Sequence, residues 1–292
     1  MGSPLLGALR LTVYVMWTVM LIPVQWALVK MGSPAARRLP KLYHNACTRI
    51  LGFRLDVRGT ISTERPTLFV SNHSSYLDIT MLGALTEGSF IAKTEVGTWP
   101  FFGTLARLQR TVFVDRRPRN AAEHRDGIQG RLEGGDSLIL FPEGTSSDGN
   151  RTLPFKSALF SVAAFKAPDS EGGERAITVQ PVSIACTALD GIPLGHSLRP
   201  LYAWYGDMSL LPHLWTVAGL GRLTVAVEFH PPVRADDFPS RKALAQHCSE
   251  AISAGVASMI SGREQRREAV SVESRAEVGS GRGKDERATL AA

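Results

Sequence analysis

Three short apolar runs, each followed at once by polar residues, limit most strongly what this chain can fold into. The runs occupy residues 67–70, 111–114 and 137–141, and their β-branched, aromatic and aliphatic residues are typical of buried strands. Segments of helical pattern separate them, which predicts a single α/β domain with a mixed, largely parallel sheet flanked by helices. Ligands of such sheets bind beyond the carboxyl ends of the strands, so we expect the polar segments to meet there.

The first polar segment, residues 71–78, looks most like a catalytic site. His73 precedes Asp78 by five positions, a spacing that would turn the two side chains about 140° apart on one helix at ~100° per residue. His73 must therefore lie in the loop, with Asp78 in the first helical turn, if the carboxylate is to orient the imidazole as a general base. Ser75 and Asp78 also fit a helix-capping pair, and this segment alone leaves the two interpretations equal.

Residues after the other two strands suit a polar ligand. Arg116 follows the second run almost directly, and the turn after the third run contains a carboxylate, a glycine and a hydroxyl in succession: Glu143, Gly144 and Thr145. Backbone amides of such a turn suit an anionic oxygen, while the carboxylate can bind a hydroxyl. Arg151 adds positive charge a few residues later.

Residues 11–29 form an almost unbroken apolar stretch near the amino terminus. As a helix, this stretch would reach ~28 Å, close to the hydrocarbon thickness of a bilayer. We therefore assign residues 1–34 to an N-terminal membrane anchor, with a signal peptide as the rival. Pro23 and Gln25 sit poorly in lipid and leave open a helix that lies in one leaflet. Basic residues after the stretch predict that the catalytic part lies on the cytoplasmic face of the inner membrane: Arg37, Arg38 and Lys41.

Composition excludes some classes of function. The 292 residues are 44% apolar and carry a formal net charge of +6, which suits a packed core and a surface near anionic lipid. No basic helix is interleaved with aromatic residues, so nucleic-acid binding is not predicted. The three cysteines, Cys47, Cys186 and Cys248, are too widely separated to predict a metal site, and they suit buried thiols in a reducing compartment.

The rest of the pattern completes one catalytic domain at residues 35–261, followed by a disordered tail at 262–292. Further strands are expected at residues 53–59, 89–93, 177–184, 201–205 and 223–229. Helices are expected at residues 35–51, 120–134 and 242–260, with a helix or loop at 210–215. Pro181 predicts an edge position or a bulge for its strand. The apolar cluster at residues 99–103 either lines an acyl pocket or packs in the core.

Four segments together resemble the motifs of the glycerolipid acyltransferases typified by 1-acylglycerol-3-phosphate acyltransferase. Residues 72–78 resemble the NHxxxxD motif, 113–116 the second motif, 141–145 the FPEGT motif and 179–182 the fourth. The order and spacing are also similar, and the resemblance extends over about residues 39–260.

The resemblance implies transfer of a fatty acyl group to the hydroxyl of a lysolipid. The enzyme would meet this acceptor among the lipids of a membrane. The donor would be a thioester of acyl carrier protein or coenzyme A, with no permanently bound cofactor. His73 would be the general base and Asp78 its orienting partner. The acceptor head group would be bound by Arg116, Glu143, Gly144 and Thr145, assisted by Lys93. One histidine suffices for this chemistry, because a departing thiolate with a pKa of about 8.5 needs little acid help.

The acceptor has two interpretations. The resemblance favours 1-acylglycerol-3-phosphate, which would give phosphatidate. Members that use it commonly carry an arginine after FPEGT, whereas this chain has Ser146. Residues 141–151 and 205–208 look like the branch that includes lyso-ornithine lipid O-acyltransferases, although Arg151 can compensate for the missing charge. A lipid hydrolase using the same pair and a non-catalytic lipid-binding protein are more distant alternatives.

Overall fold

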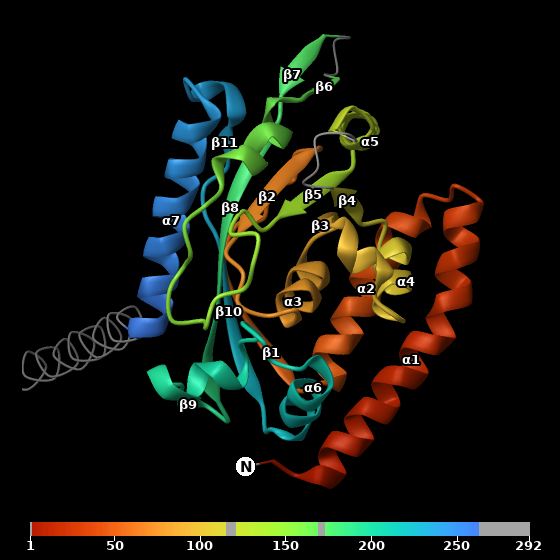
Figure 1. Ribbon diagram of the computed structural model, residues 1–292, viewed down its shortest axis with the longest axis vertical. Helices are drawn as coiled ribbons and strands as arrows, with labels where there is room; N and C mark the ends of the chain where they lie inside the picture. The colour runs from red at the N-terminus through yellow and green to blue at the C-terminus, as the bar shows by residue number, and fades with distance from the viewer. Residues whose placement is uncertain (1, 115–120, 169–172, 263–292) are drawn as a thin grey trace, which may run out of the picture.

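A mixed sheet forms the centre of the molecule. The computed structural model describes residues 2–114, 121–168 and 173–262. Within these ranges one nine-stranded sheet has the order β1-β10-β8-β2-β5-β3-β4, and β9 and β11 also pair with β8 (Figure 1). The strands are β1 Phe53–Gly59, β2 Thr67–Ser71, β3 Gly88–Lys93, β4 Val112–Val114, β5 Ser137–Leu140, β8 Thr178–Leu189, β9 Ile192–Pro193, β10 Leu223–Phe229 and β11 Val233–Arg234. The short strands β6 Lys166–Pro168 and β7 Glu174–Ala176 pair separately.

Strand direction confirms the predicted sheet type. β2 pairs in parallel with both β5 and β8, and β3 pairs in parallel with both β4 and β5. β10 is antiparallel to β8, which makes the sheet mixed. The carboxyl ends of β2, β3, β4 and β5 therefore lie at one edge of the sheet, and the polar segments after β2 and β5 follow there.

Helices cover both faces of the sheet (Figure 1). They are α1 Pro4–Lys30, α2 Ala35–Ile50, α3 Leu77–Leu85, α4 Phe102–Leu108, α5 Ala121–Glu133, α6 Leu210–Gly219 and α7 Arg241–Ser261, with 3-10 helices η1 Thr94–Thr98, η3 Ser157–Ala164, η4 His196–Leu201 and η5 Ala235–Asp237. Adjacent residues of β2 point to opposite cores. Leu68 packs in the core that α7 covers, whereas Phe69 packs in the core that holds Met81 and Leu82 of α3.

One strand prediction was wrong, and so was one of the two alternatives for Pro181. Residues 201–205 form the end of η4 and an irregular segment, because this apolar run is buried against the loop after β2, where Trp204 N donates to Ser74 O. Pro181 lies in the central strand β8, where it is aligned with Val70 of β2. The Pro181 carbonyl points away from β2, toward the side of β8 on which β10 lies. It accepts a hydrogen bond from His230 N, the first residue after β10. On that side three residues, 230–232, lie opposite the two residues 180 and 181, between the pairs Phe229–Val182 and Val233–Val179. The edge alternative is therefore wrong and the bulge alternative holds, and a residue without an N–H is tolerated where the ladder is irregular.

The long N-terminal helix α1 exposes an apolar face and holds three of its polar side chains against the domain. Among the described residues it is the one helix long and apolar enough to cross a membrane. Leu9, Met16 and Trp26 are exposed. Its polar side chains turn toward the domain through Arg10–Leu220, Thr18–Tyr43 and Gln25–Ala36 hydrogen bonds of 2.6, 2.9 and 3.0 Å. The fold thus has a long apolar helix, as predicted, and this helix is attached to the domain along its length.

Other predictions concern single residues and the chain end. Cys47, Cys186 and Cys248 are free and buried, as expected. Gly262 ends α7 in the left-handed conformation, with φ of 64°. The tail predicted to be disordered lies, from residue 263 onward, outside the described residues.

Candidate active site

The loop between β2 and α3 is fixed by its asparagine. The Asn72 side chain donates from Nδ2 to Ile184 O and accepts at Oδ1 from Ile184 N, both at 2.9 Å. This two-point contact joins the loop to β8 in the way that a neighbouring strand would. His73 is therefore held just beyond the end of β2, and Asp78 falls in the first turn of α3.

His73 and Asp78 form a hydrogen-bonded pair. The distance from His73 Nδ1 to Asp78 Oδ2 is 3.0 Å, and the carboxylate is fully buried while the imidazole is 19% exposed. Because Asp78 Oδ2 accepts, Nδ1 carries the hydrogen and Nε2 is left as the basic nitrogen. The same oxygen accepts from Ser74 N at 2.7 Å and Ser75 N at 2.9 Å. The capping and pairing interpretations of Asp78 therefore hold together.

Tyr202 completes the surroundings of Asp78 and was missed from the sequence. Its hydroxyl donates to Asp78 Oδ1 at 2.7 Å. The ring is buried, and burial, together with the Asp78 charge, raises the pKa of Tyr202 well above its ordinary value. The phenol therefore stays protonated and donates. No motif marked this residue, and its apolar neighbours made residues 201–205 look like a strand.

Glu143 lies on the other side of His73. Its Oε1 accepts from His73 N at 3.3 Å, while Oε2 has no partner among the described residues. Burial raises the pKa of Glu143 to about 8, against the opposing effect of amide hydrogen bonds from His73 and Leu153. At neutral pH the carboxyl is therefore largely protonated.

Hydrogen bonds join the loops that surround the pair. Ser147 N donates to His73 O at 2.9 Å, and Trp204 N donates to Ser74 O at 2.8 Å. The Ser146 hydroxyl donates to Trp204 O. The position where an arginine was expected in phosphate-binding relatives is thus occupied by a side chain that links two loops.

The other predicted binding residues have no described hydrogen bond to the His73–Asp78 pair. Gly144 and Thr145 lie in the turn after β5, and Lys93 ends β3. Against the opposing effect of burial, hydrogen bonds from Asn150 and the nearby charge of the exposed Arg151 lower the pKa of Asp148. Arg116 lies outside the described residues. No three His, Cys, Asp or Glu side chains of the described segments are grouped as a metal site requires.

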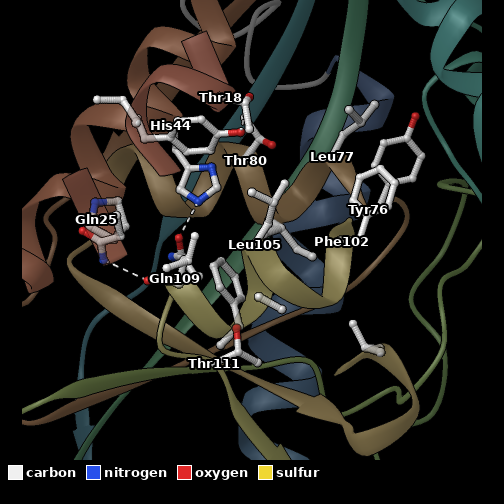
Figure 2. A pocket seen from close by; sticks show the side chains of 18 of the residues that line it. Thr18, Gln25, His44, Tyr76, Leu77, Thr80, Phe102, Leu105, Gln109 and Thr111 are labelled. Atoms are coloured by element: carbon white, nitrogen blue, oxygen red, sulfur yellow. Dashed lines mark hydrogen bonds between the residues drawn. The ribbon is translucent and has the colours of Figure 1, made fainter. Parts of the chain in front are cut away.

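A stack of rings leads from the pair to an apolar pocket. The His73 ring stacks on Phe141 with centroids 4.2 Å apart, and Phe141 stacks on Phe90 at 6.1 Å. Phe90 lines a largely apolar pocket between the N-terminal helices and α3, α4 and α6 (Figure 2). Trp99 and Phe102, from the apolar cluster noted in the sequence, also line it.

The fold therefore places a hydrogen-bonded histidine–aspartate pair just after a parallel strand, with ring stacking from His73 to an apolar pocket. Residues 54–185 match the family described as Acyltransferase, and the chain belongs to that family.

Relatives extend over most of the chain. The lyso-ornithine lipid O-acyltransferase of Brucella abortus (strain 2308) is 44% identical over 84% of this chain and 91% of its own length. The protein of the same description from Rhizobium meliloti (strain 1021) is 38% identical over 86% of each. The 1-acyl-sn-glycerol-3-phosphate acyltransferase of Neisseria meningitidis is 33% identical over 68% of this chain and 73% of its own.

One solved structure has a similar fold. The crystal structure of the 1-acyl-sn-glycerophosphate acyltransferase PlsC from Thermotoga maritima has a TM-score of 0.61 and is 22% identical. The similarity covers 87% of this chain and 92% of that one.

Proposed function

We propose that this acyltransferase is a lyso-ornithine lipid O-acyltransferase. Its acceptor would then be a lyso-ornithine lipid and not 1-acylglycerol-3-phosphate, which the motif resemblance favours. Three relatives with that description are 38–44% identical and a fourth is 30% identical, against 33% for two described as 1-acyl-sn-glycerol-3-phosphate acyltransferases. The observation that carries the proposal is Ser146. The Ser146 hydroxyl donates a hydrogen bond to Trp204 O, and the side chain brings no positive charge to the turn after β5.

The chemistry follows from the pair. His73 Nε2 takes the proton of the acceptor hydroxyl as its oxygen attacks the thioester carbonyl of the donor. A tetrahedral intermediate then expels the thiolate, so that one C–O bond forms and one C–S bond breaks. The imidazolium, held by Asp78, returns the proton to the sulfur. The donor is an acyl carrier protein or coenzyme A thioester, and protonated Glu143 donates to the acceptor.

The acceptor preference is tested with Ser146 variants. The parent protein, in detergent micelles with one labelled donor, should acylate lyso-ornithine lipid with a kcat/KM at least about 100-fold above that for 1-acylglycerol-3-phosphate. Ser146→Arg should narrow this ratio, because a guanidinium then faces the phosphate. Ser146→Ala serves as the control, since it loses the bond to Trp204 and adds no charge. Equal use of both acceptors by the parent protein would contradict the proposal.

We further propose that α1 rests in the cytoplasmic leaflet of the inner membrane and does not span it. Its apolar face is exposed, three of its polar side chains bond to the domain, and Ser3 N donates to Gly219 O at 2.9 Å, so the start of α1 lies beside α6. A spanning helix would separate Ser3 from Gly219 by the width of a bilayer.

Labelling a Ser3→Cys variant tests this arrangement. In sealed inverted vesicles a membrane-impermeant maleimide should label the new cysteine, because it lies on the domain side. The native cysteines are buried and should give little background. Labelling confined to right-side-out vesicles would mean that α1 spans the membrane.

A further inference from the structure

Arg199 of η4 is a buried arginine that bonds in two directions. It is 9% exposed, and arginine is rarely buried without partners. Its Nη2 donates to Leu194 O at 3.3 Å and to Ile260 O at 3.0 Å, in the segment after β9 and in the last turn of α7. Its Nη1 donates to Asn150 Oδ1 at 2.6 Å. One guanidinium thus joins the body of the domain to the loop after β5.

Asn150 belongs to a turn at residues 147–150, called here the 147–150 turn. Within the turn, Asn150 donates to both carboxylate oxygens of Asp148, from N to Oδ1 at 3.0 Å and from Nδ2 to Oδ2 at 3.2 Å. Gly149 N donates to Ser147 Oγ at 3.3 Å. These bonds give the turn its shape, but both partners of each lie inside it. The bond from Arg199 instead fixes the place of the turn relative to the rest of the domain.

The 147–150 turn also contacts the loop that carries the catalytic histidine. Ser147 N donates to His73 O at 2.9 Å. Gly149 is packed so that a Cβ built on it would lie 3.8 Å from Arg199 Cβ and 3.9 Å from Ser74 Cβ. The turn is therefore held between Arg199 and the loop after β2.

The residues that the sequence predicts to bind the acceptor head group flank this turn. Glu143, Gly144 and Thr145 precede it, and Arg151 follows it directly. A binding loop that is already held in its bound conformation loses less entropy when the ligand arrives, so its affinity is higher. Loosening the 147–150 turn should therefore weaken acceptor binding.

The catalytic pair depends on the backbone of Arg199 and not on its side chain. Tyr202 N donates to Arg199 O at 3.0 Å, and a substitution at position 199 keeps that carbonyl. Asp78 should therefore still accept from the Tyr202 hydroxyl and from His73. The side chain and the backbone of Arg199 thus hold different parts of the site.

We propose that Arg199 is a positioning residue for acceptor binding. Its buried guanidinium holds the 147–150 turn in the conformation that receives the acceptor head group, and it does not touch the substrate itself. This inference rests on the proposed function, because it takes the loop after β5 as the place where the acceptor binds. It does not depend on which lysolipid is the acceptor.

Kinetics with acceptor and donor varied in turn test this role, with the full chain in detergent micelles. Arg199→Met removes all three bonds, whereas Asn150→Ala removes the bond to the turn and leaves those to Leu194 and Ile260. Each variant should raise the acceptor KM about tenfold, as expected for the loss of one charge-assisted hydrogen bond. The donor KM and kcat should stay close to the parent values, because the pair is held through the backbone.

Further variants separate positioning from a general loss of fold. Arg199→Lys should not restore the acceptor KM, since one ammonium group cannot reach Asn150 and both carbonyls together. The matched control is Arg241→Met at the exposed start of α7, which should leave every constant unchanged. The double variant Arg199→Met/Asn150→Ala should raise the acceptor KM no further than Arg199→Met alone, because both changes break the same bond.

An unchanged acceptor KM in folded Asn150→Ala would overturn the proposal even if Arg199→Met failed to fold. Additive effects in the double variant, or a fall in kcat at constant acceptor KM, would overturn it as well. All constants are measured with both lyso-ornithine lipid and 1-acylglycerol-3-phosphate. If the second is the better acceptor and its KM rises in the same way, the proposed function fails and the role of Arg199 stands.

Discussion

Replacing His73 by alanine lowers the rate of acyl transfer by about 10³- to 10⁴-fold, because the acceptor hydroxyl then loses the base that takes its proton. The imidazole is 19% exposed and makes no core contact that the fold requires beyond the stack on Phe141. Folding and membrane binding should therefore persist. The measurement is the rate of diacyl product formation with a labelled thioester at saturating acceptor.

A matched histidine variant controls for the loss of a ring. His196 is exposed and lies in η4, so His196→Ala should retain the parent rate. A His73→Ala protein that keeps more than a tenth of the parent activity while folded would contradict the role of His73 as the base.

Replacing Asp78 by asparagine should lower kcat by about 10³-fold, with KM little changed. The fully buried carboxylate accepts from Ser74 N, Ser75 N and His73 Nδ1 at one oxygen and from the Tyr202 hydroxyl at the other. The asparagine side chain accepts hydrogen bonds only at its oxygen. Its NH₂ group must therefore face hydrogen-bond donors at the position of one of the two carboxylate oxygens. Both the orientation of the imidazole and the charge that stabilises imidazolium are then lost.

Asp56→Asn is the control for this substitution. Asp56 lies on β1, its side chain is 41% exposed, and it bonds to Arg58, so the change should leave kcat as it was. Thermal unfolding of the Asp78→Asn variant should show a loss of about 1–3 kcal/mol, as expected for mismatched buried groups. Near-parental kcat in a folded Asp78→Asn protein would exclude Asp78 as the orienting partner.

Tyr202→Phe should lower kcat less than Asp78→Asn does, because it removes only one hydrogen bond to the Asp78 carboxylate. Losing one hydrogen bond to a charged group corresponds to about a tenfold fall in kcat. The acidic limb of the pH–rate profile should also move to higher pH, which a purely structural defect would not cause. Phe53 packs edge-to-face on the Tyr202 ring at 6.2 Å, so Phe53→Leu perturbs the packing and keeps the hydroxyl. An unshifted profile in Tyr202→Phe would make Tyr202 a structural residue only.

Features set by local sequence were predictable. The apolar runs that became β2, β4 and β5 end where polar residues begin, and the parallel sheet brings their ends together. Helical periodicity alone placed His73 in the loop and Asp78 in the first turn of α3. The composition of a short segment determines such features, so they can be derived without knowledge of distant contacts.

Features set by long-range contacts were not predictable. Tyr202 meets Asp78 across 124 positions of the chain, and no local pattern indicates that contact. Gln25 looked like a poor lipid-facing residue, yet it faces the domain because α2 and α4 supply carbonyls for its amide. Pro181 left an edge position and a bulge open, because the sequence does not reveal that β10 ends beside it in the middle of the sheet.

One product analysis tests most directly whether the His73 site transfers acyl groups to a lyso-ornithine lipid. The purified full chain is given a labelled acyl thioester with equimolar lyso-ornithine lipid and 1-acylglycerol-3-phosphate, and the products are separated by mass spectrometry. Ornithine lipid should account for nearly all the label, and thioester consumption should stop when both acceptors are left out. Label that appears mainly as phosphatidate, or as free fatty acid at the same rate without an acceptor, would contradict this function.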